Sequence, residues 1–535
     1  MVQEYSRDEA QQSSEFSYQS VVRWSLFAWL GVAIVLTGIN ASHAIPSFYS
    51  YKHGWISAHF SVGARTFANF GITAFGGVPV VNNPPFGVVT EAYLHWPPVF
   101  NFLLAAVYCV FGVSEASSHA LMFVLLAVNT LLLGLLVHRC FGFIAAQFAC
   151  LTWLGCGVVG TYAHLVWNDH LMMAFVFLSL LGFINASSST RWAVVGASSY
   201  ALAIATSWEA VPIFPGLLAL SLWIGDKGKI RLAGIYALIG VAVPALILVN
   251  SAHFYPQQVA ELWQRALFRM GLAHEYVSAY ATGSHRQFAL PSAFTVIRTI
   301  VQRHFDLIGI LPLAAVAWLL ASTVDSGRDR RHDDGLVVFA GLVSMWWLWV
   351  IVFHSHIFIH DCHIYDALPA AAFAAGAVGQ ALVCLVDRLL AGKAWSRKVL
   401  VVVVIPLILL APLASAARNS TRFIRRGTEA HLEEPEAFSE VQFGLDLLRN
   451  TEPGAVVITP DENMVPVYYS QRHHVQGVNS DQDVQAALVH AVKNFPGSPL
   501  YLAIPTASAQ LFPASLAKGQ LVGRYSGMTL VRVGR

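Results

Sequence analysis

Long apolar runs recur along the whole chain, and they constrain the fold more than any other feature of the sequence. A run of ~20 apolar residues crosses the ~30 Å hydrocarbon layer of a bilayer as a helix, because a helix satisfies its own backbone hydrogen bonds in lipid. Hydrophobic residues make up 56% of the 535 residues and charged residues 12%, whereas a soluble protein carries about 25% charged residues. We therefore predict an all-α polytopic membrane bundle of about 11 transmembrane helices with additional outer surface helices. The runs lie at 24–42, 117–137, 143–161, 169–185, 193–208, 210–224, 232–250, 306–322, 335–353, 367–387 and 399–416.

Charge and cysteine usage exclude several other classes of protein. The net charge of +2 is too small for a nucleic-acid-binding surface. The six cysteines include no CxxC pair, which argues against a disulfide framework and against a zinc ribbon. Residues 1–23 are polar and precede the first run without a small-residue cleavage site, so we predict a cytoplasmic tail and a retained first helix.

Lysine and arginine residues determine the predicted orientation, because cytoplasmic loops carry the excess of positive charge. With the N-terminal tail inside, the short loops near 162–168, 207–211 and 354–366 fall outside, and they contain neither Lys nor Arg. The stretch from Val99 to Val113 would invert this pattern if it crossed, so we predict an interfacial or re-entrant helix on the outer face; a short twelfth crossing is the alternative. The basic residues of the short inner loops are Arg139, Arg191, Lys227, Lys229, Arg231, Arg328, Arg330, Arg331, Lys393, Arg397 and Lys398.

The transmembrane domain is predicted to span 24–417 and to carry two long outer loops, which we call the first outer loop (43–116) and the second outer loop (251–304). Within the second, Gln257 to Gly271 has apolar residues at helical spacing and is predicted to lie at the membrane surface.

Residues 418–535 have the composition of a soluble domain on the outer side. Apolar runs at 455–459 and 500–504 predict buried strands, 483–494 predicts an amphipathic helix, and 522–533 predicts a closing strand or hairpin. Strands that alternate with a helix indicate a small C-terminal α/β domain.

In this topology the unusual polar residues gather on the outer side. Any one of them has an ordinary explanation, such as a solvated loop histidine, an interfacial aromatic anchor, or a carboxylate at a helix N-terminus in the case of Asp169. Ionisable groups at membrane depth are costly, and their convergence from four loops favours a functional site. Glu209 lies between two short spans and is predicted to point into a cavity. The other members are His53, His59, Glu91, His95, Tyr162, His164, Asn168, Asp169, His170, Ser207, Trp208, His354, His356, His360, Asp361, His363 and Asp366.

The last outer loop also permits a metal site. His356, His360 and His363 are spaced to share one helical face, and Asp361 or Asp366 can add an oxygen ligand. The alternative is a polar cap whose histidines bind a lipid phosphate or a sugar. We predict that no metal or cofactor is required, with a loosely held divalent cation near a phosphate left open.

Four motifs give the chain a resemblance to a known superfamily. They are Gly54-Trp55 leading through Ala64-Arg65-Thr66-Phe67 to Phe70-Gly71; Tyr93-Leu94-His95-Trp96-Pro97-Pro98; Asn168-Asp169-His170; and His360-Asp361-Cys362-His363 before Leu368-Pro369. With these motifs the chain resembles the polytopic GT-C glycosyltransferases. Among them it is most similar to the bacterial relatives of dolichyl-phosphate-mannose protein mannosyltransferases and of the lipid A aminoarabinose transferase.

The resemblance implies a specific reaction. A sugar moves with inversion from a polyprenyl-phosphate carrier to a hydroxyl of a lipid, glycan or protein acceptor. The implied location is a bacterial plasma membrane, with the active site facing the periplasm or exterior. A base must accept the proton of the acceptor hydroxyl, and cationic groups must stabilise the departing phosphate. The catalytic candidates are His95, Glu91, His53 and Asp169. The substrate-binding candidates are His59, Arg65, Tyr93, Trp96, His164, Asn168, His170, Trp208, Glu209, Arg265, Arg269, Arg286, His356, His360, Asp361 and His363.

The first outer loop departs from the family pattern. Relatives commonly carry an acid early in this loop, where this chain has Lys52-His53-Gly54-Trp55. A catalytically inactive relative that acts in binding or assembly is therefore one alternative. A transporter is another, although the polar residues gather at one face and no symmetry relates the two halves of the chain. For Arg265 and Arg269, attraction to lipid headgroups is the alternative to a role in the site.

Overall fold

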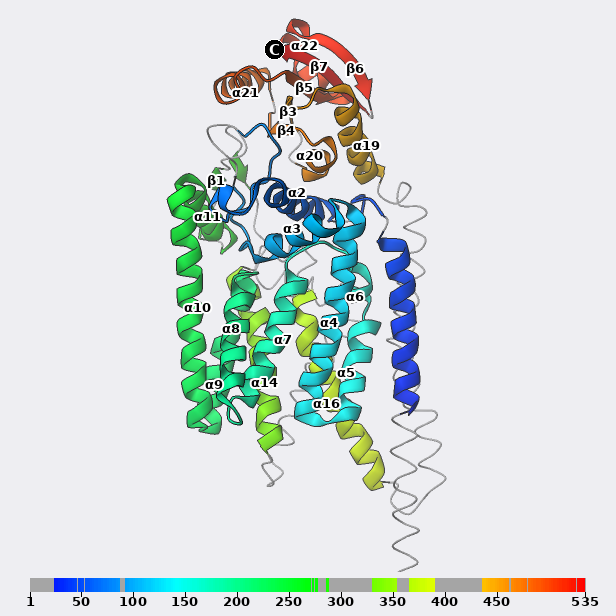
Figure 1. Cartoon of the computed structure of the whole chain (residues 1–535), viewed down its shortest axis with the longest axis vertical. Coiled ribbons are helices and arrows are strands. Elements are labelled where there is room, and N and C mark those ends of the chain that lie inside the picture. Colours follow the sequence, from blue (N-terminus) through cyan, green and yellow to red (C-terminus); the bar gives the residue numbers. More distant parts are fainter. Residues whose placement is uncertain are drawn as a thin grey trace, which may run out of the picture.

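A computed structural model describes residues 24–45, 47–51, 53–86, 92–270, 272–273, 275–277, 285–287, 330–353, 365–389, 435–460, 463–478, 480–525 and 527–534. Its main part is a bundle of helices that run side by side (Figure 1). The helices of the bundle are Trp24–Ala44, α4 (Glu115–Phe141), α5 (Phe143–Gly155), α6 (Gly157–Tyr162), α7 (Asp169–Asn185), α8 (Thr190–Ile204), α9 (Ile213–Ile224), α10 (Lys227–Phe254), α14 (Arg330–Val352) and α16 (Leu368–Leu389), with the short turn η2 (Trp208–Ala210) before α9.

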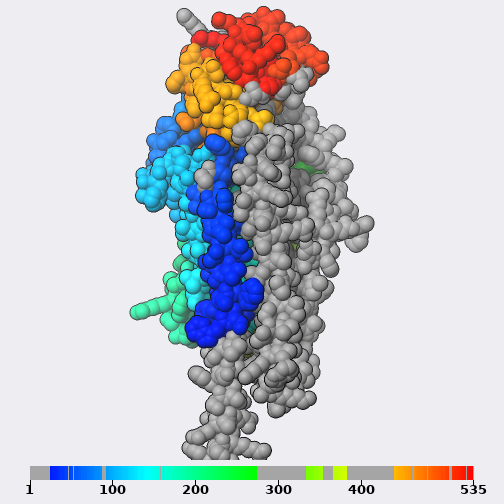
Figure 2. Space-filling view, turned by 90° about the vertical axis from the view of Figure 1, so that its right-hand side faces the viewer, coloured from blue at the N-terminus to red at the C-terminus, as the bar shows by residue number. Residues whose placement is uncertain are grey.

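Nine of the predicted crossings coincide with helices of this bundle, and the runs at 306–322 and 399–416 lie outside the described residues. Four described helices are long and apolar enough to span a membrane by themselves, namely Trp24–Ala44, Glu115–Phe141, Lys227–Phe254 and Asp333–Val352. The predicted polytopic helical membrane fold is therefore confirmed. Figure 2 shows Trp24–Ala44 on the outside of the bundle, and only 11% of its most apolar window is buried.

Close helix packing holds the centre of the bundle together. A Cβ atom on Gly182 of α7 would lie 2.4 Å from the Cα atom of Gly196 of α8, so the two backbones can approach only because both residues are glycines. Lys229 in the first turn of α10 forms a buried ion pair with Asp334 of α14 (Nζ–Oδ1 2.6 Å).

A layer of shorter helices lies across the upper end of the bundle (Figure 1). It contains α2 (Gly54–Phe70), η1 (Thr73–Phe75) and α3 (Val99–Phe111) from the first outer loop, and α11 (Pro256–Arg269) from the second. The strands β1 (Glu275–Val277) and β2 (His285–Gln287) form an antiparallel pair beyond α11. The stretch from Val99 to Val113 thus contains the 13-residue helix α3, which packs against α2 in this surface layer, and Asn101 donates to the carbonyl oxygen of Phe60 (3.0 Å).

The C-terminal domain has an α/β fold, shown in orange and red in Figure 1. Its five-stranded sheet has the order β4-β3-β5-β7-β6, in which β4, β3 and β5 are parallel and β7 and β6 are antiparallel additions. Strands β3 and β5, helix α21 and the terminal hairpin fall at the predicted positions, whereas β4 was not predicted. The elements are α19 (Pro435–Asn450), β3 (Val456–Thr459), α20 (Met464–Ser470), β4 (His473–Gln476), α21 (Asp481–Asn494), β5 (Leu500–Pro505), η5 (Thr506–Leu511), α22 (Pro513–Lys518), β6 (Gln520–Tyr525) and β7 (Met528–Gly534).

The C-terminal domain is hydrogen-bonded to the first outer loop. Arg65 of α2 donates to the carbonyl oxygen of Tyr468 (2.9 Å) and to Oδ1 of Asn83 (2.6 Å). Asn83 in turn donates to the carbonyl oxygens of Val467 (2.7 Å) and Arg472 (2.9 Å). Arg65 is a predicted phosphate-binding residue. Its buried contacts instead make it part of the interface between the transmembrane and C-terminal domains.

Candidate active site

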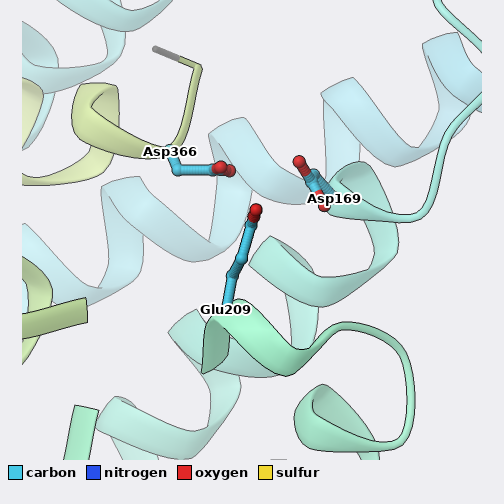
Figure 3. Close-up of side chains that lie close together, drawn as sticks. All are labelled: Asp169, Glu209 and Asp366. Atoms are coloured by element: carbon cyan, nitrogen blue, oxygen red, sulfur yellow. The ribbon is translucent and has the colours of Figure 1, made fainter. Parts of the chain in front are cut away.

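Three carboxylate side chains meet at the upper end of the bundle. Asp169, Glu209 and Asp366 point toward one another in Figure 3, and one oxygen atom of each lies within 4.8 Å of the others. All three side chains are buried. We call this group the acidic triad.

Each member of the acidic triad comes from the upper end of a different bundle element. Asp169 is the first residue of α7, and Glu209 lies in η2, whose first turn is capped by Ser207. Asp366 lies in the turn just before α16. Asn168 joins two of these elements, because its side chain donates to the carbonyl oxygen of Thr206 (3.1 Å).

His170 and Tyr365 form a supporting layer for the acidic triad. Nε2 of His170 lies 3.2 Å from the carbonyl oxygen of Tyr162, which can only accept, so Nε2 carries the proton. Nδ1 then accepts from the hydroxyl of Tyr365 (3.1 Å). Asn129 of α4 donates to the carbonyl oxygen of His170 (2.9 Å). These contacts set the positions of the residues next to Asp169 and Asp366, and they give His170 a positioning role.

The chemistry of the acidic triad follows from its charge. Three buried carboxylates at this spacing cannot all remain ionised without compensation, because like charges in a poorly solvated site repel strongly. A shared proton, a divalent cation or a cationic substrate group would each supply the compensation. Carboxylate oxygens are the ligands that Mg²⁺, Mn²⁺ and Ca²⁺ prefer, so the three residues suit a hard divalent ion. The metal site predicted from the sequence uses His356, His360 and His363 of the last outer loop, and these residues lie outside the described residues.

A second polar group lies where α11 meets the first outer loop. Arg265 donates through Nε (3.0 Å) and Nη2 (2.6 Å) to Oε1 of Glu261, and its Nη1 lies 2.7 Å from Nε2 of His95. The ring of Tyr93 packs between those of His59 and His95, with centroid distances of 3.7 and 4.7 Å. We call these five residues the histidine–arginine cluster.

Histidines of this cluster are constrained in protonation. Burial, and then the charge of Arg265, lowers the pKa of His59 to about 3, so His59 is neutral at neutral pH. Because a guanidinium can only donate, Nε2 of His95 accepts from Arg265, and the proton of a neutral His95 lies on Nδ1. The lone pair of Nε2 is therefore occupied in this structure.

The other predicted residues fall at several places. His53 stands at the start of α2 with a φ of 65° and its ring 6.1 Å from that of Tyr162. His164 packs edge-on against Tyr51 at 4.4 Å. Three further predicted residues are partly buried, namely Trp96, Trp208 and Arg269. The backbone of Arg286 pairs with that of Tyr276 between strands β1 and β2. The predicted residues that lie outside the described residues are Glu91, His356, His360, Asp361 and His363.

Two residues of these groups were not among the predicted site residues. Asp366 is one of the polar residues predicted to gather on the outer side and an optional metal ligand, but it is not among the catalytic or substrate-binding candidates, although it is an acid at one end of an apolar run, as Asp169 is. Glu261 forms an i,i+4 pair with Arg265, a pattern that normally marks a solvated helix face. Its burial depends on the packing of α11 against the first outer loop, which the sequence does not reveal.

Comparison with known proteins shows the class to which this fold belongs. The family model of dolichyl-phosphate-mannose-protein mannosyltransferases matches residues 95–253. The crystal structure of ArnT from Cupriavidus metallidurans bound to undecaprenyl phosphate is similar with a TM-score of 0.60 and 14% identity, over 94% of this chain and 97% of that chain. Its apo state gives a TM-score of 0.57 and 16% identity over the same shares of the two chains. No curated protein matches the chain by sequence.

A more distant likeness points to the same fold. The archaeal oligosaccharyltransferase AglB from Archaeoglobus fulgidus, in complex with an inhibitory peptide and a dolichol-phosphate, gives a TM-score of 0.53 and 12% identity over 90% of this chain and 70% of that chain. The chain therefore has the fold of the polytopic GT-C glycosyltransferases, and the resemblance seen in its sequence motifs is confirmed at the level of the fold.

Proposed function

We propose that this protein is a membrane glycosyltransferase that moves a sugar, with inversion, from a polyprenyl-phosphate carrier to an acceptor hydroxyl. The observation that carries the proposal is the buried acidic triad at the upper end of a GT-C bundle. Solved proteins with this fold hold undecaprenyl phosphate or dolichol-phosphate.

In this proposal a carboxylate of the acidic triad is the general base. The acceptor oxygen attacks the anomeric carbon, its proton passes to the carboxylate, and the bond from that carbon to the phosphate oxygen breaks with its electron pair leaving on the carrier phosphate. Mutual repulsion makes one member of the triad a better proton acceptor than an isolated carboxylate. Asp169 keeps its predicted catalytic role here, and Glu209 and Asp366 join it. A divalent cation at the triad would supply further positive charge near the reacting oxygens.

The histidine–arginine cluster suits the carrier phosphate. Arg265 and Arg269 provide guanidinium groups, whose planar donor geometry matches phosphate oxygens. His95 was predicted as a base, but its Nε2 accepts from Arg265. We therefore assign the neutral His95 to phosphate recognition and leave proton transfer to the triad. His59, Tyr93 and Trp96 complete the substrate-binding surface in this proposal.

The proposal includes a topology. We propose eleven crossings within residues 24–417, an extracytoplasmic domain at 418–535, and a site that faces the periplasm or exterior of a bacterial cell. The acceptor is a lipid, glycan or protein hydroxyl.

The test is donor turnover by the purified protein in lipid nanodiscs with a panel of radiolabelled polyprenyl-phosphate sugars and membrane extract as the acceptor source. Asp169→Asn should lower sugar transfer by at least ~100-fold, the usual contribution of a general base. Asp333→Asn, which removes the same charge from the first turn of α14, is the matched control and should retain activity. Absence of transfer from every carrier by wild-type protein would refute the proposal and favour the inactive or transporter alternatives.

A further inference from the structure

Glu261 is a buried carboxylate with no role in the reaction proposed above. It lies on α11, and its side chain is only 6% exposed. Helix α11 is held against the first outer loop by an apolar contact, which buries Glu261 between the two segments. This contact joins Val78, Ala92 and Leu94 of the loop to Tyr255, Val259 and Leu262 around the start of α11.

Glu261 and His95 hold the Arg265 guanidinium from two sides. Oε1 of Glu261 accepts hydrogen bonds from both Nε (3.0 Å) and Nη2 (2.6 Å) of Arg265, and these two bonds fix the plane of the guanidinium. Nε2 of His95, in the first outer loop, accepts a hydrogen bond from Nη1 of Arg265 (2.7 Å). An arginine side chain otherwise samples many rotamers, so these three contacts restrict Arg265 to one orientation before any ligand arrives.

The second oxygen of Glu261 takes no part in the contact with Arg265. Oε2 is buried and has no hydrogen-bond partner among the described residues. An unsatisfied buried acceptor costs stability, and what the buried Glu261 provides in this structure is the fixed position of the Arg265 guanidinium.

A second cation keeps the cluster suitable for an anion. Glu261 and Arg265 together carry no net charge, and Arg269 lies one turn further along α11. Burial raises the pKa of Tyr93, and the charges of Arg265 and Arg269 oppose that shift, so both guanidinium groups act on the same hydroxyl. The cluster therefore retains a net positive charge near Tyr93.

We propose that Glu261 is a positioning residue, which fixes the guanidinium of Arg265 so that it receives the phosphate of the polyprenyl carrier without further ordering. The proposal rests on the glycosyltransferase function given above. It makes a preorganised anion site out of two segments, α11 and the first outer loop, that are far apart in the sequence. Loss of Glu261 should weaken phosphate binding through Arg265, while the sugar and the acceptor contacts remain.

The experiment measures equilibrium binding of polyprenyl phosphate without a sugar, and of the glycosylated carrier, to the full-length protein in nanodiscs. Glu261→Ala should weaken binding of the bare carrier by at least ~10-fold, and Glu261→Gln by less, because the amide oxygen still accepts from Arg265. Gln257→Ala, an exposed position one turn earlier on α11, is the matched control and should bind as the wild type does. Arg265→Ala should weaken binding as much as the double variant with Glu261→Ala, because Glu261 acts through Arg265.

Four results separate the possible outcomes. An unchanged affinity for the bare carrier in both Glu261 variants would overturn the proposal. If Glu261→Ala does not fold, the affinity of the near-isosteric Glu261→Gln variant is used instead, and an unchanged value there would overturn the proposal. A loss confined to the glycosylated carrier would overturn it by showing that Glu261 touches the sugar. If the fold-losses in affinity of Glu261→Ala and Arg265→Ala multiplied in the double variant, the proposal would be overturned, because the two residues would then act independently. If wild-type protein bound neither carrier, the proposed function would fall with it, and that result is distinct from the other three.

Discussion

Replacing one carboxylate of the acidic triad by its amide should stabilise the protein while it removes turnover. The triad oxygens lie within 4.8 Å of one another. With an effective dielectric constant of ~20, two unit charges at this separation repel by about 3.5 kcal/mol. A shared proton already relieves part of this repulsion, so we expect a neutral amide to gain about 1–3 kcal/mol of stability.

Glu209→Gln is the cleanest form of this test. The backbone of η2 is held by Ser207 and does not depend on the Glu209 carboxylate, whereas Asp169 also benefits from its position at the N-terminus of α7. The measurements are the thermal unfolding midpoint in the presence of a chelator and the rate of sugar transfer. Turnover should fall by ~100-fold or more while the midpoint rises. Asp333→Asn should retain turnover and should not raise the midpoint, because it removes a carboxylate from the first turn of α14 and relieves no repulsion within the triad.

The reasoning fails if Glu209→Gln lowers the midpoint and retains turnover. That result would show that the three carboxylates do not repel one another in the folded protein and that none of them acts on the substrate. A lowered midpoint without chelator, with a raised one in its presence, would instead identify a cation that compensates the charge.

Three further predictions concern the C-terminal domain and the cation. Asn83→Ala removes the hydrogen bonds to two backbone carbonyls and to the Arg65 guanidinium, so docking of the C-terminal domain on the first outer loop should weaken by about 3 kcal/mol. Amide hydrogen exchange in α20 should then become ~100-fold faster. Asn250→Ala, which removes one exposed hydrogen bond, should have little effect. Burial lowers the pKa of His473 to about 4 and that of His474 to about 3, below the ordinary ~6.5. The unfolded C-terminal domain therefore binds more protons than the folded one, and the free energy of unfolding should fall as pH drops from ~6.5 toward 4. Amide hydrogen exchange in β3, corrected for the intrinsic rate, should be faster at pH 5 than at pH 7.5. Mn²⁺ should raise the unfolding midpoint of wild-type protein and leave that of Glu209→Gln unchanged, and equal shifts in both would place the ion elsewhere.

The transmembrane helices could be predicted from the sequence because their signal is local. An apolar run of sufficient length is helical in lipid whatever its neighbours are. The run predicted at 143–161 shows the limit of this rule, because it divides into α5 and α6 at Cys156, between two glycines. Glycine permits a break without requiring one, so the division depends on packing.

Two members of the acidic triad, Asp169 and Glu209, were among the predicted site residues, but the way they are brought together was not predicted. The sequence placed Asp169 and Glu209 at outer helix ends, yet nothing in their spacing shows that η2 and the turn before α16 bring Glu209 and Asp366 to the same point. Arg65 illustrates the reverse. It occupies a family motif, but the chain uses it to dock α20, because Asn83 and the carbonyl oxygen of Tyr468 lie within reach.

The two polar groups of the upper end have opposite charge and different supports. The acidic triad is built on the bundle, at the ends of α7, η2 and α16, whereas the histidine–arginine cluster is built on the surface layer, from α11 and the first outer loop. Sugar transfer makes opposite demands on the two sides of the anomeric carbon, since the attacking oxygen loses a proton and the leaving oxygen gains negative charge. In the proposed function, the acidic triad serves the first demand and the fixed guanidinium of Arg265 serves the second. Because the groups stand on separate layers, the distance between them depends on how the surface layer packs on the bundle, and in the proposed function that packing is therefore part of the catalytic geometry.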